Sequence, residues 1–225
     1  MPTTIYRDPV TKKRLPSVTT VLGVLNKPAL VAWANRMGLE GKTLHEASDP
    51  LADVGTDLHE LCAASIAGRP SAPLKCTEVE QIDMLTNAYT RFLTWRNMHK
   101  IVPVIAETPL VSKQGFGGTL DFYGHIDDAP LIVDFKTSKS IYLEHRIQVS
   151  TYVYLARENG HKVDGAMIVR VGRDDGEGFD FANLGELEID ACYEFFLRTL
   201  WIYRAQQMLD KSDFNSVIQM SVPEV

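Results

Sequence analysis

Three charged side chains on two adjacent predicted strands could do chemistry together. Asp121 interrupts the apolar run TLDFYG, and Asp134 and Lys136 interrupt LIVDFK, where apolar and charged residues alternate with the period of two that is typical of strands. Asp134 and Lys136 therefore share a face. The segment IDDAP between the two runs has the residues of a tight turn, so we expect a hairpin that brings Asp121 near Asp134.

Two neighbouring carboxylates need a compensating charge. At a separation of about 4 Å they repel by roughly 4 kcal/mol at an effective dielectric constant of about 20, so the pair calls for a proton, a basic partner or a divalent cation. Mg²⁺ is satisfied by one or two carboxylates, a backbone carbonyl and several waters, and substrate phosphates often complete its coordination. With Lys136 beside them to position or deprotonate a water, these groups fit metal-assisted attack on a phosphodiester.

An Asp-x-Lys sequence alone is also a common surface salt-bridge pattern. The context favours a site, because charged side chains rarely occupy a half-buried strand without a partner.

Five motifs in a fixed order resemble a known family. The order is Gly55-Thr-x-x-His59, Glu107, GGTLDFYG, LIVDFKTSK and Gln148-x-x-x-Tyr152. It resembles the RecB-like branch of the PD-(D/E)XK nuclease superfamily, and most of all its phage-type exonucleases and the mitochondrial genome maintenance exonuclease group. The resemblance implies an α/β fold: a restriction-endonuclease-like mixed central sheet flanked by helices, with an N-terminal helical layer. It also implies Mg²⁺ or Mn²⁺ as cofactor.

The resemblance further implies a role for each matched residue. The implied metal ligands are His59, Asp121, Asp134 and the carbonyl of Phe135. The implied catalytic residues are Asp121, Asp134, Lys136, Glu107, Gln148 and Tyr152. A neutral His59 imidazole would shift the metal preference towards Mn²⁺. Judged without the resemblance, the sequence favours an ordinary core or surface histidine at His59, and Glu107 is equally compatible with a strand-end charge in solvent.

Hydroxyl, basic and aromatic side chains elsewhere are candidates for contacting nucleic acid. Hydroxyls can hydrogen-bond phosphates, and an aromatic ring can stack on a base. Helix capping by the hydroxyls and core packing of the tryptophan are the structural alternatives. The candidates are Ser17, Thr19, Thr20, Trp33, Thr137, Ser138, Arg146 and Arg170.

Composition indicates one globular domain. The chain has 225 residues, of which 45% are hydrophobic and 23% charged, enough for a sizeable core. We expect a single nuclease domain over 1–225, with a mainly helical layer over 1–100, the catalytic sheet and helix over 101–180, and a C-terminal helix over 181–225. Within this layout a helix is expected to start at Asp53 or at the Asp49-Pro50 step before it, and the segment before Pro16 is expected to be a turn.

Several classes of protein are disfavoured. No apolar run reaches the ~18 residues of a membrane span, so no membrane association is expected. The three cysteines lack CxxC spacing, which argues for a reducing compartment and against an iron–sulfur cluster. We expect a cytoplasmic protein of a bacterial or phage-infected cell. The net charge of −6 disfavours tight, nonspecific duplex binding, so any DNA contact requires a local basic track.

The sequence therefore predicts a metal-dependent deoxyribonuclease, an exonuclease that prefers single-stranded or frayed DNA ends. Three alternatives remain open: a duplex-resecting recombination exonuclease of the same fold, an endonuclease of the same fold, and a non-catalytic DNA-end-binding module. The expected partners are DNA and a recombination or replication protein.

Overall fold

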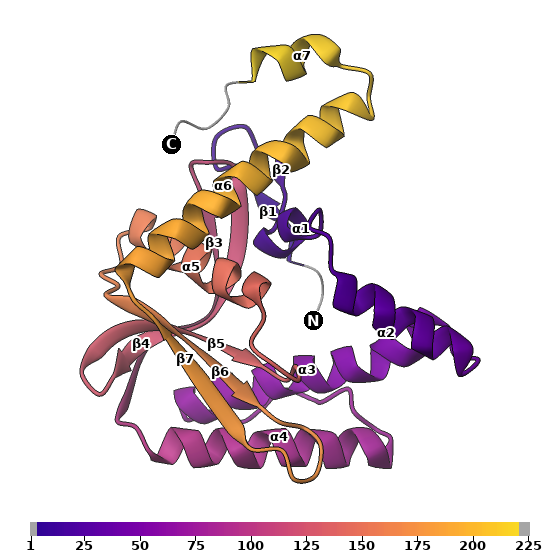
Figure 1. Ribbon diagram of the computed structural model, residues 1–225. Helices are drawn as coiled ribbons and strands as arrows, with labels where there is room; N and C mark the ends of the chain where they lie inside the picture. The colour runs from indigo at the N-terminus through magenta and orange to yellow at the C-terminus, as the bar shows by residue number, and fades with distance from the viewer. Residues whose placement is uncertain (1–3, 221–225) are drawn as a thin grey trace.

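A five-stranded mixed sheet runs through the middle of the computed structural model, which describes residues 4–220 (Figure 1). Its strand order is β3-β4-β5-β6-β7. The strands are β3 (Ile101–Ser112), β4 (Phe116–Ile126), β5 (Ala129–Lys136), β6 (Gly165–Val171) and β7 (Phe179–Leu184). Only β5 and β6 run parallel, while the other neighbours are antiparallel. This confirms the predicted mixed α/β class.

Helices cover both faces of the sheet, as expected, because each face carries its own apolar cluster. One face packs against α1 (Val18–Leu22), α5 (Leu143–Glu158) and α6 (Glu186–Leu209). The other packs against α3 (Leu44–Ala67) and α4 (Val79–Asn97). α5 connects the parallel strands β5 and β6, which is the crossover that parallel pairing requires.

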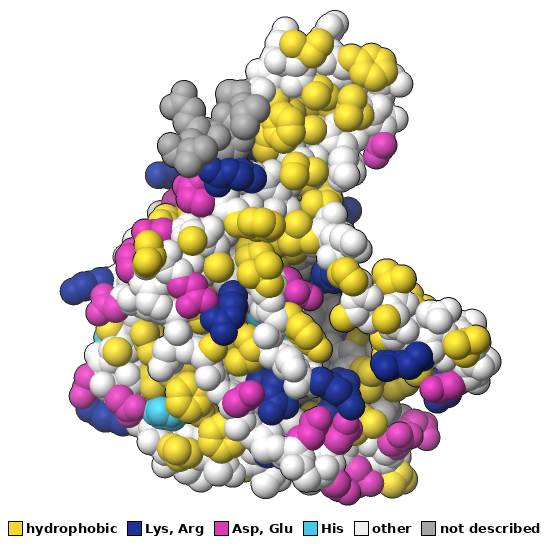
Figure 2. Space-filling view, viewed as in Figure 1, with side chains coloured by type: hydrophobic (Ala, Val, Ile, Leu, Met, Phe, Trp, Pro, Cys, Tyr) yellow, Lys and Arg dark blue, Asp and Glu magenta, His cyan; other side chains and the backbone are white. Residues whose placement is uncertain are grey.

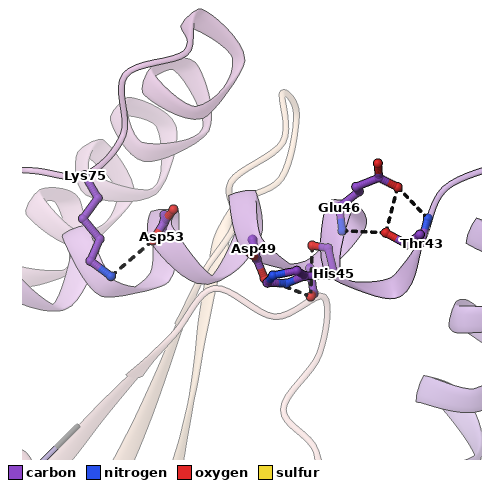
Figure 3. Close-up of polar contacts among 7 residues, drawn as sticks. Thr43, His45, Glu46, Asp49, Asp53 and Lys75 are labelled. Atoms are coloured by element: carbon purple, nitrogen blue, oxygen red, sulfur yellow. Dashed lines mark hydrogen bonds and ion pairs between the residues drawn. The ribbon is translucent and has the colours of Figure 1, made fainter. Parts of the chain in front are cut away.

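The predicted start of α3 was wrong. The helix begins at Leu44, upstream of both predicted starts, and it contains Pro50. The Thr43 side chain accepts the Glu46 N–H, and the Glu46 carboxylate accepts the Thr43 N–H, which makes a capping box (Figure 3). This cap starts the helix upstream of the proline.

The terminal regions contain elements that were not expected. Before α1, β1 (Tyr6–Arg7) and β2 (Arg14–Leu15) form a small hairpin in place of a simple turn. After α6, the short α7 (Phe214–Gln219) follows, and 221–225 of the predicted C-terminal helix lie outside the described residues. Strands of two residues each are too short to show alternation in the sequence.

The helix α2 (Pro28–Leu39) has no buried residue and projects away from the sheet (Figure 1). Its first residue is Pro28, as predicted, since the missing proline N–H costs nothing at a helix start. No helix within residues 4–220 combines the length and apolarity that crossing a membrane demands.

Gly117 allows the N-terminal hairpin to sit on the sheet. A Cβ at this position would lie 2.3 Å from the Tyr6 ring, while the Gly117 N–H donates to the Pro16 carbonyl at 2.9 Å. Gly117→Ala is therefore expected to lower the free energy of unfolding by about 1–3 kcal/mol, because the ring must move. Urea denaturation should show this loss, with Gly38→Ala as control, since a Cβ there meets no atom within 4 Å. Equal stability of the two variants would contradict this packing.

Candidate active site

Asp121 and Asp134 lie at the point where β4 and β5 separate. The antiparallel ladder runs from Ile126–Ala129 to Phe122–Val133 and stops there. Asp121 and Asp134 occupy the next position. Here the Asp121 side chain replaces the backbone hydrogen bonding between the strands, because Asp121 Oδ2 accepts the Phe135 N–H at 3.2 Å. The hairpin thus brings the two acids together as its turn chemistry predicted, with Asp127 and Asp128 both at positive φ in the tight turn.

Asp134 is a buried carboxylate with one close charged partner. Its side chain is only 1% exposed, and Lys136 Nζ lies 2.8 Å from Oδ2. This ion pair compensates the charge on Oδ2, while no group of the described residues hydrogen-bonds to Oδ1. Burial raises the pKa of Asp134 to about 6, although Lys136 opposes this shift. Buried polar atoms without partners are uncommon, and they point to a missing ligand.

His59 reaches the same place from α3. Its Nδ1 lies 3.1 Å from Asp121 Oδ2. Burial lowers the pKa of His59, but the Asp121 carboxylate outweighs this effect and the net shift is upward. Burial likewise raises the pKa of Asp121, while His59 and Lys136 outweigh it and the net shift is downward. In this arrangement the two groups form an ion pair, whereas metal ligation by His59 requires a neutral imidazole.

Lys136 keeps its proton in this setting. Burial lowers its pKa, but the carboxylates of Asp134 and Asp121 outweigh burial, so the net shift is upward. The group is therefore suited to donating hydrogen bonds rather than to removing a proton.

Glu107 lies on β3 between the residue pairs Ala106–Phe122 and Thr108–Leu120, which places it opposite Asp121. Its φ of 47° is in the left-handed region that glutamate rarely adopts. Burial, and then the nearby Glu60 carboxylate, raise the pKa of Glu107. Strained backbone clusters at functional sites, so the conformation speaks against a strand-end charge in free solvent.

Gln148 and Tyr152 face the carboxylates from α5. Gln148 Nε2 donates to Tyr152 Oη at 2.9 Å. Burial raises the pKa of Tyr152 well above its usual range, and Asp134 and Asp121 raise it further. Gly118 leaves space for this ring, because a Cβ there would lie 2.6 Å from Tyr152 Cε1. The phenol therefore remains protonated beside the acid pair.

Two residues near the site were not predicted from the sequence. Burial, followed by the charge of Lys136, lowers the pKa of His145 to about 4, and His145 Nδ1 accepts the Tyr142 N–H at 3.2 Å. The sequence feature that could have identified His145 is its position three residues before Gln148, which places both residues on the same face of α5. Glu60 follows His59 directly, but it is occupied by two Arg69 contacts at 2.7 and 3.1 Å. Nothing local in the sequence distinguishes this glutamate from a surface acid.

The residues predicted to bind substrate are dispersed. Arg146 pairs with Glu188 on α6, and Arg170 pairs with Asp180 on β7. Ser138 Oγ donates to the Ser140 carbonyl. These side chains are engaged by the protein itself, so their substrate roles remain predictions.

The five other residues predicted to bind substrate lie in three separate places. Thr137 lies against α3, where its Oγ1 is 3.7 Å from the position of a Cβ on Gly55. Trp33 is half-buried on α2, outside the core. Figure 2 shows a hollow between the projecting α2 and the body of the protein, with Lys and Arg side chains along its lower edge. Ser17, Thr19 and Thr20 line a separate cavity beside α6.

The acid pair fits a divalent cation of the magnesium type. Within residues 4–220, no three His, Cys, Asp or Glu side chains form a ready-made metal cluster. Mg²⁺ needs no such cluster, because one or two carboxylates with waters and phosphate oxygens suffice. Asp134 Oδ1 is buried without a hydrogen bond to the described residues, and the contacts given to Asp121 by the described residues fall on Oδ2.

Comparison with known proteins gives only distant structural similarity. No protein-family profile matches the chain, and no curated protein matches it. The crystal structure of SSO0001 matches 64% of this chain and 74% of its own, with a TM-score of 0.33 and 12% identity. The crystal structure of LHK-Exo in complex with dAMP matches 73% of this chain and 92% of its own, with a TM-score of 0.32 and 14% identity. TM-scores this low carry no argument about function, which has to come from the geometry.

Proposed function

We propose that this protein is a metal-dependent deoxyribonuclease that hydrolyses phosphodiesters, acting as an exonuclease on single-stranded or frayed DNA ends. The observation that best supports the proposal is the buried carboxylate of Asp134, which lies beside Asp121, is paired with Lys136 through Oδ2, and has no hydrogen bond to Oδ1. We propose further that the chain forms one nuclease domain in the cytoplasm and works with a replication or recombination protein.

Asp121 and Asp134 would hold Mg²⁺ or Mn²⁺, with the Phe135 carbonyl and His59 as further proposed ligands. The bound cation would polarise a phosphoryl oxygen and lower the pKa of a water molecule. For His59 to take part as a ligand, it would have to give up the proton that its pairing with Asp121 now favours. Binding should therefore release a proton, as metal binding to a histidine generally does.

The protein's own groups would orient the reactants. Lys136 stays protonated, so it would hold the attacking water or a phosphate oxygen by donating a hydrogen bond, which stabilises charge that develops during the reaction. Tyr152, protonated and bonded to Gln148, would donate to the same region. Glu107 would keep the site negative enough to attract a cation.

The proposal is tested by incubating the protein with labelled linear single-stranded DNA and with circular single-stranded DNA, in Mg²⁺, in Mn²⁺ and in EDTA. We expect the linear strand to be degraded only with metal, and the circle to survive. Cutting of the circle would favour an endonuclease. DNA binding in EDTA without cleavage in either metal would reject the proposal in favour of a binding module.

Trp33 is expected to contribute to binding of single-stranded DNA. It is half-buried on a helix that buries no residue, and stacking of a base on an aromatic ring is worth about 1–3 kcal/mol. Trp33→Ala should therefore weaken binding by about 5- to 150-fold, measured by fluorescence anisotropy in EDTA. Trp33→Phe retains an aromatic ring and should lose much less. Equal affinities for all three proteins would remove Trp33 from the interface.

A further inference from the structure

A cavity of about 940 Å³ lies between the N-terminal segment and the C-terminal half of α6, away from the acid pair. We call it the α1–α6 cavity and define it by Arg14, Ser17, Thr20, Arg204, Gln207 and Lys211, all of which line it. The lining residues come from the β1–β2 hairpin and the start of α1 on one side and from α6 on the other, and Figure 1 shows α1 next to α6.

Cations in this cavity lack acidic partners. Among the described residues, no carboxylate forms an ion pair with Arg14, Arg204 or Lys211. Asp213 also lines the cavity, but its Oδ1 accepts the Ser216 N–H as the cap of α7. The Arg204 guanidinium donates to the backbone carbonyls of Gln114 and Gly115. In a chain with net charge −6, three cations against one carboxylate still leave the lining of this cavity net positive, which favours an anion.

Hydroxyl groups lie in the same cavity. Ser17 Oγ is 2.9 Å from Thr19 Oγ1 and 2.7 Å from Thr20 Oγ1, and it accepts the Thr20 N–H. Hydroxyl and cationic side chains are the groups that contact phosphates in protein–DNA complexes. The lining therefore favours a phosphate group over a carboxylic acid or an apolar ligand.

The cavity is connected to the acid pair along β4. Tyr6 lines the cavity, and its hydroxyl lies 2.7 Å from Thr119 Oγ1, two residues before Asp121. Ser17 pairs with Gly117 in an isolated parallel β-bridge, and Gly117 is four residues before Asp121. At the rise of a strand, four residues span about 13 Å, which corresponds to roughly four stacked nucleotides.

We propose that the α1–α6 cavity binds a phosphate of the same DNA strand whose scissile bond lies at Asp121 and Asp134, about four nucleotides away. This inference rests on the proposed nuclease function and adds to it a second point of attachment. The phosphate is either internal to the strand or at its end, since both present the same oxygens.

The test is binding of fluorescent oligothymidylate in EDTA, where no metal-dependent cleavage occurs, by wild type and by Arg14→Gln/Lys211→Gln. Both side chains are exposed and make no recorded side-chain hydrogen bond within residues 4–220, so the double variant should fold. We expect affinity for a 12-nucleotide strand to fall about tenfold or more, and the slope of log K against log salt to shrink by about 1.4, or 0.7 per lost contact.

Lys162→Gln is the matched control, because Lys162 is an exposed lysine outside the cavity.

Strands with a 5′-phosphate, a 3′-phosphate or no terminal phosphate show whether the cavity binds an internal or a terminal phosphate. An equal loss for all three identifies an internal phosphate, and a loss confined to one phosphorylated strand identifies a terminal one. The proposal is overturned if the double variant binds like Lys162→Gln, or if wild type binds no strand. Cleavage is scored separately: binding through the cavity without cleavage would reject the nuclease proposal alone, and cleavage with unchanged binding would reject the cavity alone.

Discussion

Lys136→Ala is expected to reduce the rate of DNA cleavage by about two to three orders of magnitude, the usual effect of removing one preorganised donor from an active site. The ammonium group is the cation nearest to Asp134, at 2.8 Å, and it remains protonated despite burial. Its loss should lower kcat, measured with saturating Mn²⁺ and linear single-stranded DNA, because Lys136 is a donor and not a proposed metal ligand.

The matched control is Lys139→Ala. Lys139 follows the same strand end but is 70% exposed and pairs with Asp174, so its replacement should leave the cleavage rate within about twofold. A Lys136→Ala enzyme as fast as this control would show that the buried ammonium group takes no part in the reaction.

Mn²⁺ is expected to stabilise the wild-type protein but not Asp134→Asn or Asp121→Asn. At a concentration of about 100 times Kd, a ligand that binds only the folded state adds about 2.7 kcal/mol to the free energy of unfolding. Replacing either carboxylate by an amide removes an anionic ligand with little change in shape, so most of this gain should disappear. Denaturant titration with Mn²⁺ and with EDTA measures the gain without reference to activity.

Asp128→Asn controls for the general loss of an acidic side chain. Asp128 lies in the hairpin turn at the other end of the β4–β5 pair, at a positive φ that asparagine also tolerates, and it pairs with Lys100. This variant should keep the full Mn²⁺ stabilisation. An equal Mn²⁺ effect in Asp134→Asn and Asp128→Asn would place the cation elsewhere.

Local patterns in the sequence were sufficient to predict the centre of the site. Alternation placed Asp134 and Lys136 on one face, and the turn between the strands set the register that brings Asp121 beside Asp134. Both signals arise from short segments, where side-chain period and turn chemistry act directly. The mixed sheet with helices on both faces was expected from the family resemblance, and the structure has this architecture.

Features that depend on long-range contacts could not be predicted in this way. The pairing of His59 with Asp121 joins α3 to β4, and the neutral state of His145 depends on its burial beside Lys136. The left-handed backbone of Glu107 has no marker such as glycine in the sequence. Burial and neighbouring charge determine these properties, and both arise only when distant segments pack together.

The most direct test of the central claim is a crystal grown with Mn²⁺ and a short single-stranded oligonucleotide, examined for anomalous scattering. We expect a Mn²⁺ peak at direct coordination distance from carboxylate oxygens of both Asp121 and Asp134, with a phosphate oxygen of the strand on the same ion. A structure in which Asp134 stays paired only with Lys136, Asp121 only with His59, and the ion and the strand lie elsewhere would contradict it.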